Sequence, residues 1–385
     1  MVYLDYNAST PVDQRVMPAI VEAFGEFGNP SSTQHRAGQA ATALIEEARS
    51  RVGGLVGRPP RDVVFTSGAT EAAMIGLLGA MLGARKRPNA VVGATEHKAI
   101  FAAAKLGAKF TGGVVRRVGV DQCGLVDLDQ LNDLVDDTVA VVAVMAANNE
   151  TGVIGPTAAV GEITRAAGAL HFVDVTQLAG KGSVSDIERY ADLMVCSSHK
   201  IYGPKGAGAL VASRHTQRQL VPVSAGGGQE HGLRGGTHNT PAIAGFGVAA
   251  QLAEKEHVSD AVRWGMLASD LYSHLVGELE GVVLNGHDAP RLSNTLNLRF
   301  TGVDNEAVMA SMPDVLVSTG SACQSAVTTH SHVLLAMGLS SSEAAESIRI
   351  SLGRQTTSEE IRSATAKIIN AVKRVRSLTE RRVYL

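Results

Sequence analysis

Four short apolar segments, each ending in polar residues, limit the folds that this chain can adopt. They lie at residues 63–67, 140–145, 170–175 and 192–197, and segments with helical spacing separate them. Short apolar runs bounded by turn-forming residues are typical of buried strands, and strands that alternate with helices form mostly parallel sheets. We therefore predict an α/β fold in which helices cover both faces of a mostly parallel central sheet. Ligands of such sheets bind beyond the carboxyl ends of the strands.

The length of the chain predicts more than one domain. It has 385 residues, which exceeds the usual size of a single hydrophobic core. The alternation of strands and helices runs from about residue 12 to residue 255, and a charged helical stretch and shorter apolar segments follow. We predict a large domain over residues 12–255 and a smaller α/β domain formed by residues 1–11 and 256–385.

Charge, apolar runs and cysteine spacing restrict the partners and the cell compartment that we expect for this chain. The net charge of −2 predicts no direct nucleic-acid binding. The N-terminus lacks a basic and apolar leader, and no apolar run approaches the ~18 residues of a membrane span, so we expect a cytoplasmic protein without a membrane partner. The three cysteines, Cys123, Cys196 and Cys323, form no Cys-x-x-Cys pair, which argues against a structural zinc site or a disulfide framework.

Lys200 is the first candidate for a catalytic group. It directly follows His199 and precedes a turn rich in glycine and proline at residues 203–206. An amine that attacks a carbonyl must be neutral, and an ordinary lysine, with a pKa near ~10.4, is neutral only about once in a thousand near pH 7. Neighbouring cations lower that pKa. The position suits a Schiff base, although a solvated surface lysine is the ordinary alternative.

Thr70 and Asp174 supply groups that complement Lys200. Thr70 follows the first strand at a predicted helix N-terminus, which is a ready site for an anion; an ordinary N-cap is the alternative. Asp174 ends the third strand, where a carboxylate needs a cationic partner. The carboxylate could form a structural salt bridge or cap a helix, or it could pair with a protonated ring nitrogen. The three residues together match the aldehyde, phosphate and ring nitrogen of pyridoxal 5'-phosphate (PLP).

Specific motifs occur along nearly the whole chain. They lie at residues 4–11, 27–32, 65–71, 95–98, 148–150, 199–200, 234–237, 318–323 and 347–354. With these motifs the chain resembles the NifS/IscS-type cysteine desulfurases, which are fold-type-I PLP enzymes of the class-V aminotransferase family. The resemblance implies a PLP cofactor, a homodimer, and conversion of L-cysteine to L-alanine with the sulfur carried as a persulfide on Cys323 to an acceptor protein.

The resemblance also implies a role for each site residue. Lys200 is expected to form the Schiff base with PLP and to remove the Cα proton of the substrate. His97 is expected to stack on the pyridine ring and relay protons, and Asp174 to pair the ring nitrogen. The other expected cofactor-binding residues are Thr70, Ala69, Asn149, Gln177, Ser197, His199 and Thr237, the last reaching the phosphate in the partner subunit. Substrate binding is expected from Arg349, Asn29 and Asn149.

Cys323 distinguishes a desulfurase from related PLP enzymes. Its neighbours at residues 318–322 are small, which predicts an exposed loop. A thiol at such a place suits a sulfur carrier, and the attacking species must be the thiolate. An incidental surface cysteine is the alternative; the chain would then be a C–S lyase, a selenocysteine lyase or an aminotransferase. A non-catalytic relative would be expected to lack Lys200 or Asp174, and both are present.

The histidines after Cys323 bear on the sulfur acceptor. His330 and His332 are unusual for the family. They are local candidates for the base that forms the Cys323 thiolate, but we expect them in an exposed polar loop, and without a metal because no third ligand is visible in the sequence. The chain also ends at Leu385, without the longer tail by which some members of the family dock a scaffold protein. Both features leave open whether the sulfur serves iron–sulfur cluster assembly or a specialised pathway such as DNA phosphorothioate modification.

Overall fold

A seven-stranded sheet lies at the centre of the structure, a computed structural model that describes residues 1–184, 186–319 and 330–383. The strand order is β2-β8-β7-β6-β5-β3-β4. Strand β8 is antiparallel to both of its neighbours and the other pairs are parallel, which confirms the predicted α/β sheet. The strands are β2 (Val63–Thr66), β3 (Asn89–Gly93), β4 (Val115–Val118), β5 (Val139–Ala143), β6 (Leu170–Asp174), β7 (Leu193–Ser197) and β8 (Gly208–Ala212).

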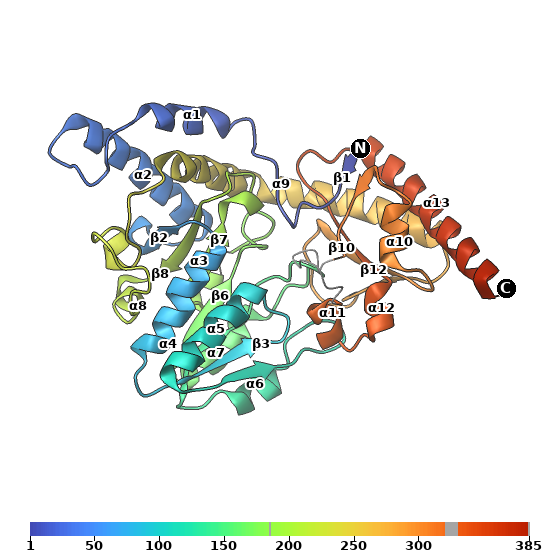
Figure 1. The fold of residues 1–385 in the computed structure, drawn as a ribbon, viewed down its shortest axis with the longest axis horizontal. Helices are drawn as coiled ribbons and strands as arrows, with labels where there is room; N and C mark the ends of the chain where they lie inside the picture. The colour runs from blue at the N-terminus through green and yellow to red at the C-terminus, as the bar shows by residue number, and fades with distance from the viewer. Residues whose placement is uncertain (185, 320–329, 384–385) are drawn as a thin grey trace.

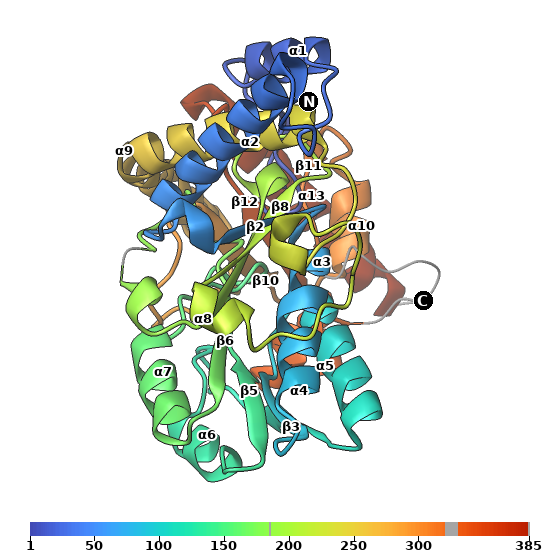
Figure 2. The same ribbon diagram turned by 90° about the vertical axis from the view of Figure 1, so that its left-hand side faces the viewer.

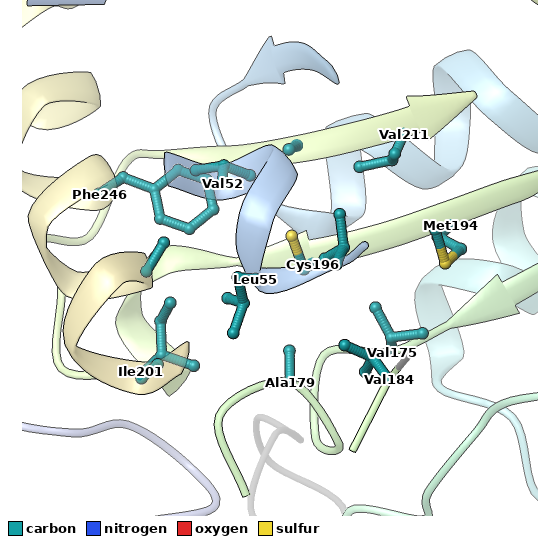
Figure 3. Close-up of a cluster of buried hydrophobic side chains, with 14 of the residues drawn as sticks. Val52, Leu55, Val175, Ala179, Val184, Met194, Cys196, Ile201, Val211 and Phe246 are labelled. Atoms are coloured by element: carbon teal, nitrogen blue, oxygen red, sulfur yellow. The ribbon is translucent and has the colours of Figure 1, made fainter. Parts of the chain in front are cut away.

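Helices cover both faces of this sheet (Figures 1 and 2). Successive side chains of a strand point to opposite faces, and β7 shows this directly. Met194 and Cys196 pack with α2 and α9 on one face (Figure 3), whereas Leu193 and Val195 pack with the α3–α5 region on the other. The helices around the sheet are α1 (Met17–Gly25), α2 (Arg36–Leu55), α3 (Ala69–Ala73), a π-helical segment (Met74–Leu78), α4 (Gly79–Gly83), α5 (Lys98–Thr111), α6 (Leu128–Leu134), α7 (Thr157–Ala166), α8 (Arg214–Gln217) and α9 (Thr240–Glu278).

A second, smaller core forms around an antiparallel sheet of order β12-β10-β9. The N-terminal strand β1 pairs with β11 beside it, so both ends of the described chain contribute to this core. The elements of this core are β1 (Val2–Tyr3), β9 (Val282–Leu284), β10 (Thr295–Phe300), α10 (Asn305–Ala310), β11 (Val315–Leu316), β12 (Ser347–Ser351) and α13 (Ser358–Val383). Two short helices, α11 (His332–Ala336) and α12 (Ser341–Ala345), pack in a separate small apolar cluster.

Helix α9 links the two cores. Its Phe246 is buried in the core of the large sheet and its Trp264 in the core of the small sheet. The boundary near residue 255 that we predict from the sequence falls inside this continuous helix, so the division into two domains stays a prediction. No helix in the described ranges is both long and apolar enough to cross a membrane.

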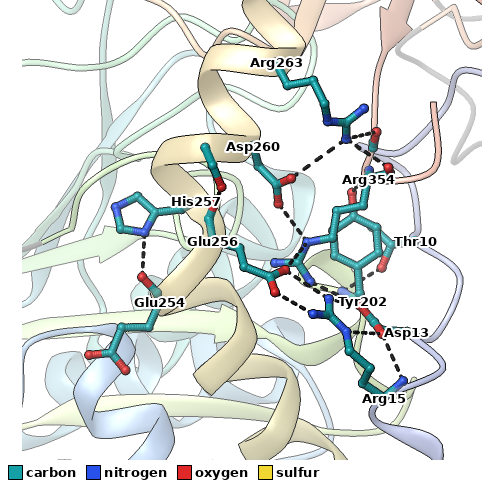
Figure 4. Close-up of polar contacts among 12 residues, drawn as sticks. Thr10, Asp13, Arg15, Tyr202, Glu254, Glu256, His257, Asp260, Arg263 and Arg354 are labelled. Atoms are coloured by element: carbon teal, nitrogen blue, oxygen red, sulfur yellow. Dashed lines mark hydrogen bonds and ion pairs between the residues drawn. The ribbon is translucent and has the colours of Figure 1, made fainter. Parts of the chain in front are cut away.

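A charged cluster at the middle of α9 holds the two cores together beside the turn that follows Lys200 (Figure 4). Arg354 donates to Asp260 at 2.7 Å and lies 3.4 Å from Glu256 and 3.5 Å from Asp13. Its guanidinium also stacks on the Tyr202 ring, 4.6 Å from the ring centroid. The Tyr202 hydroxyl accepts a hydrogen bond from the Arg354 backbone N–H at 2.8 Å. This contact matters because Tyr202 has a left-handed backbone, with φ of 67°, which a tyrosine adopts only when its surroundings hold it there.

We predict that Arg354→Met lowers the free energy of unfolding by about 1–3 kcal/mol, because it removes the 2.7 Å ion pair of the buried Asp260 and the cation that stacks on the Tyr202 ring. Arg15→Met is the matched control: Arg15 contacts the same Asp13 and Glu256, but it is half-exposed. Its loss should cost less than about 1 kcal/mol. Urea unfolding of both variants tests this. Equal losses of unfolding free energy would show that the contacts of Arg354 stabilise the protein no more than those of Arg15.

Candidate active site

A cavity of about 560 Å³ lies beyond the carboxyl ends of β6 and β7. It contains most of the predicted site residues. Asn29 and Thr237 are exposed and do not line it, and Cys323 lies outside the described residues. The predicted residues that line the cavity are Ala69, Thr70, His97, Asn149, Asp174, Gln177, Ser197, His199, Lys200 and Arg349.

Lys200 enters the cavity from the end of β7. Its Nζ donates to the carbonyl oxygen of Asn7 at 2.6 Å and to that of Ala8 at 2.8 Å. The Thr10 hydroxyl, which accepts from the Tyr202 N–H at 2.8 Å, fixes the turn behind it. The N-terminal segment therefore positions the amine, although it is almost 200 residues away in the sequence.

His97 presents a neutral imidazole to the same cavity. It is the N-cap of α5, and its Nδ1 accepts a hydrogen bond from the Ala99 N–H at 3.2 Å. Burial lowers the pKa of His97, and the charge of Asp174 opposes this shift. Because Nδ1 is an acceptor, the neutral ring carries its proton on Nε2.

Asp174 brings a carboxylate to the cavity at the end of β6. Its Oδ1 accepts from the Thr176 N–H at 2.8 Å. Behind it lies Glu96, which is fully buried and accepts from the Met145 N–H. Burial raises the pKa of Glu96 well above its usual value, and the charge of Asp174 raises it further.

Hydroxyls and a neutral imidazole gather at the other end of the cavity. The turn between β2 and α3 packs closely on the sheet, since a Cβ at Gly208 would lie 2.5 Å from the Cα of Gly68. His199 contacts the Ser9 hydroxyl at 3.3 Å, and burial lowers the pKa of His199 to about 4. The side chains at this end that can donate to an anion are Ser9, Ser67, Thr70, Ser197 and His199.

Arg349 has a donor left for a bound carboxylate. Its Nη1 donates to the Asn149 carbonyl at 3.0 Å and its Nη2 to Asp5 at 2.5 Å. Its Nε is buried and has no hydrogen-bond partner among the residues that the structure describes. A guanidinium N–H in that position suits a carboxylate acceptor.

This set of groups fits PLP. An amine, a carboxylate and a cluster of hydroxyl and imidazole donors correspond to the aldehyde, the ring nitrogen and the phosphate of that cofactor. The volume is within the usual range for small-ligand sites, roughly 300–1,000 Å³. The buried, unpartnered Nε of Arg349 adds a site for an amino-acid carboxylate.

Lys181, which the sequence analysis does not single out, is almost fully buried behind Gln177. Its Nζ donates to Gln177 Oε1 at 2.6 Å, and Gln177 Nε2 donates to the Asn7 carbonyl at 3.0 Å. Burial lowers the pKa of Lys181 well below its usual value, and the charges of Lys200 and Arg349 lower it further. The two hydrogen bonds fix which side of the Gln177 amide is the donor. A lysine four residues after Gln177 was the only available signal.

The prediction of an exposed loop for both histidines is wrong for His332. His330 is exposed, but His332 is half-buried, and its Nε2 lies 2.9 Å from the carbonyl oxygen of Glu96. Its ring also meets the Phe101 ring edge-on, with centroids 6.0 Å apart. The described ranges contain no group of three or more His, Cys, Asp or Glu side chains that could hold a metal ion.

The two described cysteines differ from a reactive thiol. Cys196 is buried in β7, and burial raises its pKa to about 12, so it is an inert packing group, as its apolar strand predicts. Cys123 is half-buried in a turn, where its N–H donates to Asp121 at 2.9 Å. Neither lines the cavity.

Comparisons with known proteins agree with this geometry. The family model "Aminotransferase class-V" matches residues 2–363. A "Cysteine desulfurase" of Frankia sp. is 46% identical over 391 residues, which cover 99% of this chain and 93% of the relative. A solved "NifS-like protein" has a TM-score of 0.87 and 33% identity, and the alignment covers 97% of this chain and 99% of that one. DndA from Streptomyces lividans has a TM-score of 0.74 and 36% identity, with 89% and 97% covered.

The lowered pKa of Lys181 predicts a pH-dependent stability. The unfolded chain binds a proton at this lysine below about pH 10.4, whereas the folded chain does not until its lowered pKa is reached. Wild type should therefore lose stability relative to Lys181→Met as the pH falls from 10 to 8, by at most about 1.4 kcal/mol per pH unit. Urea unfolding at pH 8, 9 and 10 measures this difference. Lys109→Met, at an exposed position of α5, is the control, and a difference that stays constant with pH for Lys181→Met would contradict a neutral buried amine.

Proposed function

The chain belongs to the class-V aminotransferase family and is a cysteine desulfurase, and we propose that it works with PLP and carries the sulfur on Cys323. One observation supports this most directly: the Lys200 amine, the Asp174 carboxylate and the Arg349 guanidinium meet in one cavity. They are the groups that PLP-dependent reaction of an amino acid requires.

The proposed cofactor contacts follow from the positions of these groups. Lys200 would hold PLP covalently, Asp174 would pair its ring nitrogen, and His97 and Gln177 would contact the ring and its hydroxyl. When bound, PLP withdraws electrons from the Cα of an attached amino acid. The phosphate would lie among Thr70, Ser197 and His199, with Ala69 in the same turn.

The residues of this chain then divide the reaction of L-cysteine among them. Arg349 binds the substrate carboxylate through its Nε, and Asn149 lies beside it in the cavity. The Lys200 amine, once free, takes the Cα proton. The Cys323 thiolate attacks the substrate sulfur, so that the carbon–sulfur bond breaks and a sulfur–sulfur bond forms on Cys323. The alanine product gains a proton on carbon, for which the Nε2–H of His97 is the proposed source.

We also propose a homodimer in which Thr237 binds the phosphate in the partner subunit. Thr237 is exposed and outside the cavity of its own chain. An ion pair between Arg234 and Glu71, 3.1 Å long, ties the segment that carries Thr237 to the rim of that cavity. Phe24 and Phe27 are 74% and 91% exposed, and large exposed aromatic side chains mark interfaces. Asn29 follows Phe27 closely, and we assign it to the same region of the dimer.

The sulfur acceptor is not identified by the residues described. We propose an acceptor protein that takes the sulfur either for iron–sulfur cluster assembly or for a specialised pathway. The likeness to DndA supports the second alternative. The cytoplasm remains the proposed compartment, since thiol chemistry on Cys323 needs reducing conditions. The alternative activity is sulfide release by a C–S lyase. It needs no protein thiol, so it would not depend on Cys323.

We predict that Cys323→Ala loses the release of alanine and sulfide from L-cysteine, measured with a reductant, by at least roughly 100-fold, because it removes the nucleophile. The visible absorption of bound PLP should persist in the variant. Cys123→Ala, which alters a thiol outside the cavity, is the control and should behave as wild type. Equal activity of Cys323→Ala and wild type would instead establish a lyase.

A further inference from the structure

We propose that His332 is a positioning residue, which sets the turn that presents His97 to the cofactor. The inference rests on the proposed function and adds a residue to it. His332 begins α11, and His97 begins α5, so the contact joins elements that are more than 230 residues apart in the sequence. The hydrogen bond from His332 Nε2 to the Glu96 carbonyl is 2.9 Å long.

The turn before His97 is held by several independent contacts. The Thr95 carbonyl accepts from Asn148 Nδ2 at 3.1 Å, and the Glu96 side chain accepts from the Met145 N–H. Both of those partners follow β5 of the large sheet. The contact to the Glu96 carbonyl comes from α11, and it acts on the peptide group that directly joins Glu96 to His97.

His332 is itself held firmly. Ser331, the N-cap of α11, accepts from the Leu334 N–H at 3.1 Å and donates to the buried carboxyl group of Glu150. The His332 ring meets the Phe101 ring edge-on, and Phe101 is buried on α5. The capping bonds and the Ser331–Glu150 bond do not involve the His332 side chain. Loss of that side chain should therefore leave α11 in place.

The donor that acts here is the Nε2–H. A carbonyl oxygen only accepts, so Nε2 must carry a proton, and it does so in both the protonated ring and one neutral tautomer. A glutamine amide can reach a similar position and donate in the same way, whereas a phenylalanine keeps the ring but has no donor. An error of a fraction of an ångström at a catalytic group lowers the rate because reacting atoms lose their alignment.

The test compares His332→Phe, His332→Gln and His330→Gln in the PLP-loaded full-length enzyme. We expect His332→Phe to lower kcat for alanine formation by about five- to tenfold, as for one lost hydrogen bond, with KM nearly unchanged. Its bound PLP should show altered visible circular dichroism, which reports the asymmetric surroundings of the cofactor. His332→Gln should stay within about twofold of wild type, and His330→Gln, at an exposed position, should match wild type.

Two results would overturn the proposal. One is wild-type kcat, KM and visible circular dichroism in His332→Phe; the other is equal impairment in His332→Phe and His332→Gln, which would exclude the donor as the cause. If His332→Phe fails to fold, His332→Asn replaces it, because its shorter amide falls short of the carbonyl. A wild-type enzyme that releases no alanine would refute the proposed function and not this inference.

Discussion

The hydrogen bonds to Asn7 connect the parts on which the site depends. Its carbonyl oxygen accepts from both Lys200 and Gln177, while its side chain donates to Thr295 and accepts from Asn294. Its N–H donates to the Ser351 hydroxyl. The N-terminal segment thus lies between the large sheet, which supplies the amine and the glutamine, and the small sheet, which supplies Arg349. This segment therefore sets the position of the Lys200 amine relative to the Arg349 guanidinium.

Burial shifts the pKa values of several ionisable groups in the site toward their neutral forms. It lowers the pKa values of His97, His199 and Lys181 and raises that of Glu96. Neutral histidines and amines can accept or hold a proton, whereas fully charged ones could only repel further positive charge. The same desolvation that costs stability therefore prepares the site for proton transfer.

The sequence was sufficient for the fold class, for strands β2, β5, β6 and β7, and for most of the residues that line the cavity, whereas it did not single out β3, β4 and the antiparallel β8. Strand ends such as Asp174 and Lys200 could be placed because parallel strands bring their carboxyl ends to one edge. Lys181 and His332 could not be placed in the same way. Their roles depend on where the buried Gln177 and the Glu96 carbonyl lie in space. No periodicity or motif spacing in the sequence indicates either position. The boundary near residue 255 fell inside α9 because the charged stretch there is the exposed middle of one helix that two cores share.

The residues that the sequence missed have a common place in the structure: each lies one layer behind a residue that faces the cavity. Lys181 fixes the Gln177 amide, Glu96 lies behind Asp174, and His332 holds the peptide group before His97. Their hydrogen-bond partners are a side-chain amide, a backbone N–H and a backbone carbonyl, so these contacts orient a neighbour without a further charged partner. His332 differs from the other two because it comes from the part of the chain that follows Cys323. Through this contact, helix α11 is linked directly to the turn that carries His97.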